Sequence, residues 1–307
     1  MDIFLQQIIN GLVQGSIYAM VALGYTMVYG IMGLINFAHG EVVMIGTLVA
    51  ISVVTMLLQM GVPPVLAGAF GVATAALACM ALGWSLERIA YRPLRHAQRL
   101  APLITAIGCS IVLQNLAMMI WGRNYMTFPP LIEKTQFEFA GASFTSVQVL
   151  IVAVAGLSMS GLLFLVYRTK LGMAMRATAQ NPAVAGLMGV NANRVISSAF
   201  VVGSALGAVA GVMVGTYYEI AHYQMGFMLG LKAFTAAVLG GIGNLAGAMA
   251  GGVLLGLIEA LGAGYIGDLT GGFLGSHYQD IFAFAVLILV LMFRPSGLFG
   301  EKTGDRA

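Results

Sequence analysis

Ionisable side chains inside long apolar runs are the first candidates for chemistry in this sequence. Glu259 stands in the middle of Leu257-Ile258-Glu259-Ala260-Leu261, and Lys232 lies in the apolar run before it. A charge inside a membrane is costly unless it is paired or hydrated, so such residues are functional candidates. For Glu259 we weigh a proton relay against a structural partner such as a helix terminus or an asparagine. The structural role is favoured, because the apolar runs hold few other ionisable groups.

The other ionisable candidates have simpler interpretations. Lys232 is expected near the outer end of its run, with its ammonium group extended toward the membrane surface. His39 and Glu41 are expected at a solvated cytoplasmic boundary. His96, His222 and His277 are scattered along the chain, so we expect no metal site.

Motifs of common enzymes are missing from the sequence. It contains no G-x-x-x-x-G-K-[ST] phosphate-binding loop, no H-E-x-x-H, no C-x-x-C and no G-x-S-x-G. Cys79 and Cys109 lie in apolar runs and are read as small buried hydrophobic residues. We therefore expect no catalytic residues and no cofactor in this chain.

Composition identifies the kind of fold that must position these residues. Of the 307 residues, 60% are apolar and 8% are charged, against roughly 45–50% and about 25% in soluble domains. So few charges cannot cover a water-soluble surface, which excludes most soluble enzymes, nucleic-acid-binding proteins and disordered scaffolds. We predict an all-α, multi-pass membrane protein with one domain over residues 1–307.

Nine apolar runs approach the length of about 20 residues that spans a bilayer. The first is long enough for a tilted or broken helix. The seventh is short, ends at a glycine-rich break, and is a candidate re-entrant segment. We therefore predict eight to ten membrane helices, at about 9–32, 42–61, 64–86, 103–121, 147–167, 195–218, 229–243, 245–265 and 279–293.

Basic residues predict the orientation in the membrane. They gather in the loops at 87–101 and 168–194 and in the tail at 294–307. Because basic residues flank the cytoplasmic ends of spans, these segments and the C-terminus are expected in the cytoplasm. The loops at 122–146 and 266–278 are then expected on the outer side.

Glycines mark a close helix contact. Gly203, Gly207, Gly211 and Gly215 recur every fourth residue and share one helix face, a pattern that lets membrane helices approach closely. Packing inside the monomer and an interface between subunits are both open, with the first favoured.

The basic loop at 168–194 contains a short predicted helix. Asn181 suits the N-cap, Pro182 the first helical position and Gly189 a left-handed stop. About seven residues remain between the caps, with Val184, Leu187 and Met188 on one side. Such a helix can occupy a groove on a partner protein or lie on lipid, and the residues alone do not separate the two.

Several further motifs resemble one family along nearly the whole chain. They include residues 24–41, which end in Asn36-Phe37-Ala38-His39-Gly40-Glu41, and Tyr91-Arg92-Pro93-Leu94-Arg95. Residues 175–189 and 234–244 and the closing Arg294-Pro295-Ser296-Gly297-Leu298-Phe299-Gly300 match as well. The chain resembles the H-type permease subunits of bacterial branched-chain amino acid ABC importers, the Liv family.

This resemblance implies a subunit of a larger inner-membrane assembly. Its expected partners are a second, M-type permease, two cytoplasmic ATPase subunits that bind ATP and Mg²⁺, and a periplasmic binding protein for leucine, isoleucine or valine. It also implies that a short cytoplasmic helix docks on the ATPase. That coupling role falls on Arg176, Ala177, Gln180, Asn181, Pro182, Val184, Ala185, Leu187, Met188 and Gly189.

The translocation path is predicted from polar groups and helix breaks. An amino acid zwitterion needs hydrogen-bond donors for its carboxylate and apolar space for its side chain. The candidates are Asn36, Gln114, Asn115, Gly240, Gly241, Asn244 and Glu259. A stand-alone facilitator, or an ABC permease for another small polar solute such as an amide or urea, is the alternative to the leading hypothesis.

Overall fold

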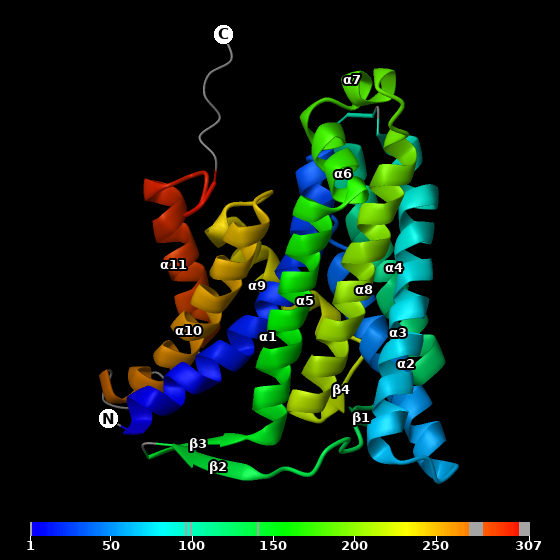
Figure 1. Ribbon diagram of the computed structural model, residues 1–307. Helices are drawn as coiled ribbons and strands as arrows, with labels where there is room; N and C mark the ends of the chain where they lie inside the picture. Colours follow the sequence, from blue (N-terminus) through cyan, green and yellow to red (C-terminus); the bar gives the residue numbers. More distant parts are fainter. Residues whose placement is uncertain (1, 96, 99, 140, 270–278, 301–307) are drawn as a thin grey trace.

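The computed structural model describes residues 2–95, 97–98, 100–139, 141–269 and 279–300, which form a bundle of apolar helices (Figure 1). Seven of the described helices are long and apolar enough to cross a membrane, and α9 and α11 are shorter apolar helices. Each predicted span corresponds to one of these nine, which confirms the all-α membrane fold. The nine are α1 (Asp2–Met32), α2 (His39–Gln59), α3 (Pro64–Leu86), α4 (Leu100–Trp121), α5 (Ser146–Arg168), α8 (Ala192–Tyr218), α9 (Met225–Gly240), α10 (Leu245–Leu269) and α11 (Gln279–Phe293).

Shorter elements lie at the two ends of the bundle, and of these only the short helix after Asn181 was predicted. The 87–101 segment begins with a π-helical turn (Glu87–Tyr91) and a 3₁₀ turn (Arg92–Leu94). The segment after α5 holds two helices, α6 (Lys170–Gln180) and α7 (Pro182–Leu187). Two antiparallel strand pairs, each strand four residues or shorter, lie in the 122–146 and 219–224 segments: β1 (Met126–Thr127) with β4 (Ile220–Ala221), and β2 (Gln136–Phe139) with β3 (Ala142–Thr145).

Helix α1 is tilted rather than broken. It runs without interruption for 31 residues, about 46 Å at 1.5 Å per residue, which exceeds a hydrocarbon thickness of about 30 Å. Figure 1 shows it crossing the bundle obliquely, with the chain's N-terminus at the end that carries β2 and β3.

The glycine face of α8 is buried inside this chain. Gly203 packs on Gly24 of α1, and Gly211 packs on Val43 and Thr47 of α2. Gly207 and Gly215 are buried on the same face. The structure therefore supports packing inside the monomer for these four glycines and excludes a subunit interface on that face.

Helix α10 is held against α1 and α9 by a second set of glycines. Its Gly252 lies against the backbone of Ala19 in α1, and its Gly251 lies against the carbonyl of Ala236 in α9. No other two described elements share as extensive a contact as α1 and α10. Small residues are what allow two membrane helices to pack this closely.

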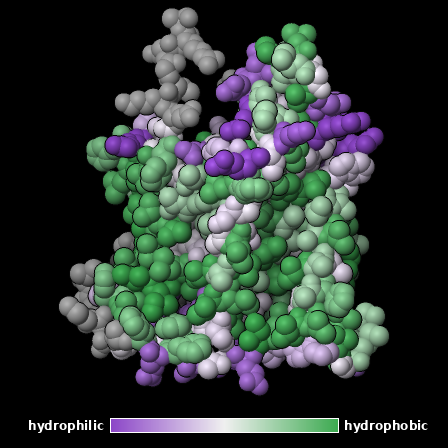
Figure 2. Space-filling view, viewed as in Figure 1, coloured by the Kyte–Doolittle hydropathy of each residue, from purple (hydrophilic) through white to green (hydrophobic). Residues whose placement is uncertain are grey.

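We call one end of the bundle the basic end, defined by residues 87–95, 168–194 and 294–300. The three segments lie at the same end of the bundle in Figure 1, opposite β2 and β3, with residues 294–300 beside α9 and α10. Figure 2 shows hydrophilic surface at both ends and an apolar band between them. The prediction that the three basic segments share one side is confirmed for the described residues. Most of the 266–278 loop and residues 301–307 of the tail lie outside the described part of the chain.

A buried acidic residue ties α3 to α8 at the basic end. The side chain of Glu87 is inaccessible to solvent, and one of its oxygens lies 3.2 Å from a guanidinium nitrogen of Arg92. Arg95 forms a second ion pair with Glu87. Ser197 of α8 donates a hydrogen bond of 2.6 Å to Glu87 Oε2, the oxygen that also lies near Arg92. Sequence analysis did not single out Glu87.

Candidate functional site

Helix α7 presents an apolar tip at the basic end. The side-chain oxygen of Asn181 accepts hydrogen bonds from the backbone of Ala183 and Val184, at 3.0 and 3.1 Å. Pro182 begins the helix, and Gly189 follows it with φ +83°. The predicted caps are confirmed, although the helix has six residues rather than seven.

Solvent exposure on α7 is concentrated on its large apolar side chains. Leu187 is 87% exposed, Met188 82% and Val184 53%, whereas Ala185 is buried. Exposed methionine and leucine side chains at the tip of a short, capped helix are unusual unless another surface covers them. The tip of α7, meaning Val184, Leu187 and Met188, is therefore a candidate docking surface.

A separate helix carries part of the predicted coupling segment. Arg176, Ala177 and Gln180 lie in α6, not in the short helix to which they were assigned. The hydroxyl of Thr169 caps α6 by accepting a hydrogen bond of 3.1 Å from the backbone of Gly172. The Arg176 guanidinium lies 5.4 Å from the centre of the Tyr167 ring in α5. This contact holds α6 close to the end of a membrane helix.

Replacing Asn181 with alanine tests how far the cap orders α7. The change removes the acceptor for two otherwise unpaired backbone N–H groups, which costs about 1 kcal/mol. We expect hydrogen exchange of the α7 amides in the purified protein to accelerate about fivefold, the factor that corresponds to about 1 kcal/mol. Asn181→Asp keeps the acceptor and is the matched control. Equal exchange rates in the alanine variant and the wild type would contradict this role.

Glu259 belongs to a cluster of charged and polar groups that joins four helices. The Lys232 ammonium of α9 lies 3.2 Å from Glu259 Oε2 of α10 and 2.7 Å from Asp280 Oδ1 of α11. Tyr18 of α1 donates a hydrogen bond of 2.7 Å to the same Glu259 oxygen. Its hydroxyl also accepts one of 3.3 Å from Lys232.

These contacts correct two predictions. Glu259 is fully buried and has a structural partner, but that partner is a lysine and a tyrosine rather than a helix terminus or an asparagine. The Lys232 side chain is only 13% exposed and points to carboxylates, not to the membrane surface. The sequence did contain a signal for the Lys232–Glu259 pair, because residues of opposite charge occur in two neighbouring apolar runs. A buried charge is stable only when it has a partner of opposite sign. Asp280 and Tyr18 were missed.

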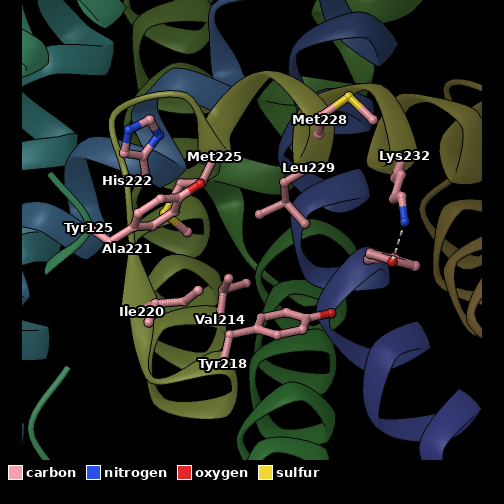
Figure 3. A pocket seen from close by; sticks show the side chains of 11 residues that line it. Tyr125, Val214, Tyr218, Ile220, Ala221, His222, Met225, Met228, Leu229 and Lys232 are labelled. Atoms are coloured by element: carbon pink, nitrogen blue, oxygen red, sulfur yellow. Dashed lines mark hydrogen bonds between the residues drawn. The ribbon is translucent and has the colours of Figure 1, made fainter. Parts of the chain in front are cut away.

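A cavity of about 270 Å³ adjoins this cluster. It lies among α1, α8, α9 and the β1–β4 pair, away from the basic end (Figures 1 and 3). Tyr18 and Lys232 form its polar end. The remaining lining is mostly aliphatic and aromatic: Tyr125, Val214, Tyr218, Ile220, Ala221, His222, Met225, Met228 and Leu229.

Two of the predicted path residues are hydrogen-bonded to buried side chains elsewhere in the bundle. Asn36 accepts a hydrogen bond of 2.8 Å from the Tyr91 hydroxyl. Gln114 donates one of 2.7 Å to Glu41, which is 1% exposed. His39 is also 1% exposed, so the expectation that His39 and Glu41 lie at a solvated boundary is wrong. Both begin α2 inside the bundle, where glycines of α9 and α8 pack against them.

The other candidates also lie outside the cavity lining. Asn115 donates to the carbonyl of Ile111 in its own helix. Gly240, Gly241 and Asn244 form the turn between α9 and α10, and the C-terminal segment covers this turn. Phe299 donates to the Gly240 carbonyl at 3.0 Å and accepts from the Asn244 side chain at 3.0 Å. Of the seven candidates, Glu259 alone is hydrogen-bonded to residues that line the cavity.

Comparison with known proteins identifies the family. Residues 7–291 match the family model described as the permease component of the branched-chain amino acid transport system. The chain belongs to this family. It is 48% identical to BraD of Pseudomonas aeruginosa, a high-affinity branched-chain amino acid transport system permease protein, over 99% of this chain and 98% of BraD.

More distant members extend the similarity. LivH of Salmonella typhimurium is also a high-affinity branched-chain amino acid transport system permease protein. It is 46% identical to this chain over 99% of this chain and 97% of LivH. A probable branched-chain amino acid transport permease protein of Methanocaldococcus jannaschii is 28% identical over 97% of this chain. These relatives are transport permeases and not enzymes, in agreement with the missing catalytic motifs. The chain is a multi-pass membrane permease.

Proposed function

We propose that this chain is a membrane-spanning permease subunit of a bacterial inner-membrane importer for branched-chain amino acids. Membership of the permease family and 48% identity to BraD over nearly the full length support this function. In the proposed assembly the chain pairs with a second permease, receives its substrate from a periplasmic binding protein and draws energy from two cytoplasmic ATPase subunits.

The exposed tip of α7 carries the link to the ATPase. Leu187 and Met188 extend from the end of the bundle where Arg92, Arg168 and Arg194 gather, and basic residues favour the cytoplasmic side. A capped helix with an apolar tip suits a groove on a soluble partner. We assign α7 and the preceding α6 as the coupling segment, with the C-terminus on the same side.

Movement of this segment can reach the membrane helices through direct contacts. Helix α6 packs against α5, α1 and α8, and α7 packs against α8. Closure of the ATPase subunits would displace α6 and α7 and bias the bundle between two packings. That coupling gives alternating access, in which the path opens to one side at a time.

Reconstitution with each component omitted in turn tests the proposed function. Proteoliposomes would contain this chain, the second permease and the ATPase subunits, with the binding protein, labelled leucine and ATP. We expect ATP-dependent uptake that collapses when the ATPase, the binding protein or this chain is left out. Uptake by this chain alone without ATP would overturn the proposal and make the protein a facilitator.

A further inference from the structure

The cavity beside Lys232 has the size and lining of a site for a small amphiphilic solute. Its volume of about 270 Å³ lies just below the range of roughly 300–1,000 Å³ that holds drug-sized ligands. Figure 3 shows Val214, Leu229 and Tyr218 around the open space, with Lys232 to one side. A mostly apolar chamber with a charged side chain at one end orients a ligand that has an aliphatic part and a charged part.

The charges at the polar end favour a solute that carries both signs. The Lys232 ammonium is shared between Glu259 and Asp280, and the Asp280 side chain is 32% exposed. Glu259 Oε1 is buried with no hydrogen-bond partner among the described residues, so one acceptor of the cluster is unused. A zwitterion adds no net charge to this cluster of one ammonium group and two carboxylates, and it offers a partner to each sign, whereas a singly charged solute offers a partner to only one sign.

We propose that this cavity is the permease's own substrate site. The aliphatic side chain of the amino acid packs beside Val214 and Leu229. The carboxylate faces Lys232, a charged side chain of the lining, and the ammonium group lies at the same end, toward the carboxylates of Glu259 and Asp280 that pair with Lys232 behind the lining. This inference rests on the proposed function and adds that the permease, not only its binding protein, distinguishes one aliphatic side chain from another.

Reducing the cavity volume tests the apolar end. We expect Leu229→Phe to lower the ratio of leucine to valine uptake about tenfold or more, because crowding one methylene in an apolar pocket costs 10–200-fold. Both amino acids would be supplied at saturation by the same binding protein in the complete importer. Leu157→Phe is the matched control, since Leu157 is 74% exposed on α5 and does not line the cavity. Its ratio should equal that of the wild type.

The outcomes separate this inference from the proposed function. Wild-type importer that takes up neither amino acid would overturn the proposed function. Wild-type importer that takes up both, with an unchanged ratio in a folded Leu229→Phe variant, would overturn the cavity assignment alone. If Leu229→Phe does not fold, Val214→Ile adds a single methylene to the wall. A several-fold fall in the ratio supports the assignment, and an unchanged ratio overturns it.

Protection from alkylation tests the polar end without transport. A Leu229→Cys variant, with Cys79 and Cys109 replaced by alanine, would be purified with its partner subunits but without binding protein and treated with N-ethylmaleimide. We expect leucine to slow alkylation at concentrations at least tenfold lower than leucinamide, which lacks the carboxylate, or 4-methylpentanoate, which lacks the ammonium group. Equal protection by all three would overturn the charge assignment, and no protection by leucine would overturn the site.

Discussion

Leu187→Arg is expected to abolish ATP-driven uptake while the permease still folds and reaches the membrane. The side chain is 87% exposed at the tip of α7, so the isolated subunit loses no packing when it changes. In the docked assembly the new charge would enter an apolar contact without a partner, which is strongly unfavourable. Uptake of labelled leucine and the amount of permease in the membrane are the two measurements.

Leu187→Met keeps an apolar side chain of similar volume and is the control for this experiment. It should retain most of the uptake. Co-purification of the ATPase with the permease adds a direct readout, which we expect to fall in the arginine variant alone. Normal uptake by the Leu187→Arg importer would refute the docking role of α7 and leave the family assignment intact.

Gly252→Leu is expected to prevent stable folding of the bundle. A Cβ atom at Gly252 would meet the backbone of Ala19, and backbone cannot move aside as a flexible side chain can. Overpacking typically lowers the stability of the folded state by about 1–3 kcal/mol and occasionally by more. We expect the loss in this variant to reach or exceed the upper end of that range, because the contact between α1 and α10 would open. The readouts are the yield of monodisperse protein in detergent and its thermal midpoint.

The same substitution at Gly156 is the matched control for steric cost. Gly156 also lies within a membrane helix, α5, but no atom lies within 4 Å of where its Cβ would stand. Gly156→Leu should therefore keep the yield and thermal midpoint of the wild type. If both variants behave alike, the close contact of α1 and α10 is not what stabilises the bundle.

Features specified by short stretches of chain were predictable. The nine apolar runs became helices because twenty apolar residues in sequence satisfy their own backbone hydrogen bonds within a membrane. The caps of α7 depend on Asn181, Pro182 and Gly189 alone, and all three take their predicted positions. Helix α6 was missed although Thr169 offered a cap three residues before Gly172. The short strand pairs were missed because segments of two to four residues carry almost no pattern.

The candidate site was only partly predictable. Glu259 was identified, because one charge in an apolar run is conspicuous. Its hydrogen bond to Tyr18 joins residues 241 positions apart, and no local pattern reports such a pair. The cavity likewise combines α1, α8, α9 and the 122–146 segment. Asn36 and Gln114 were predicted as path residues because they are polar, but each is already hydrogen-bonded to a buried side chain.

The sequence by itself determined the membrane environment, the helices, the caps of α7 and the grouping of basic segments, because composition and local backbone chemistry decide these. Only the tertiary structure decided that the α8 glycines pack inside the monomer and that Lys232 pairs with Glu259 and Asp280. It also decided where a cavity remains. Each of these depends on which helices become neighbours, and that is settled by the packing of distant faces and the pairing of buried charges.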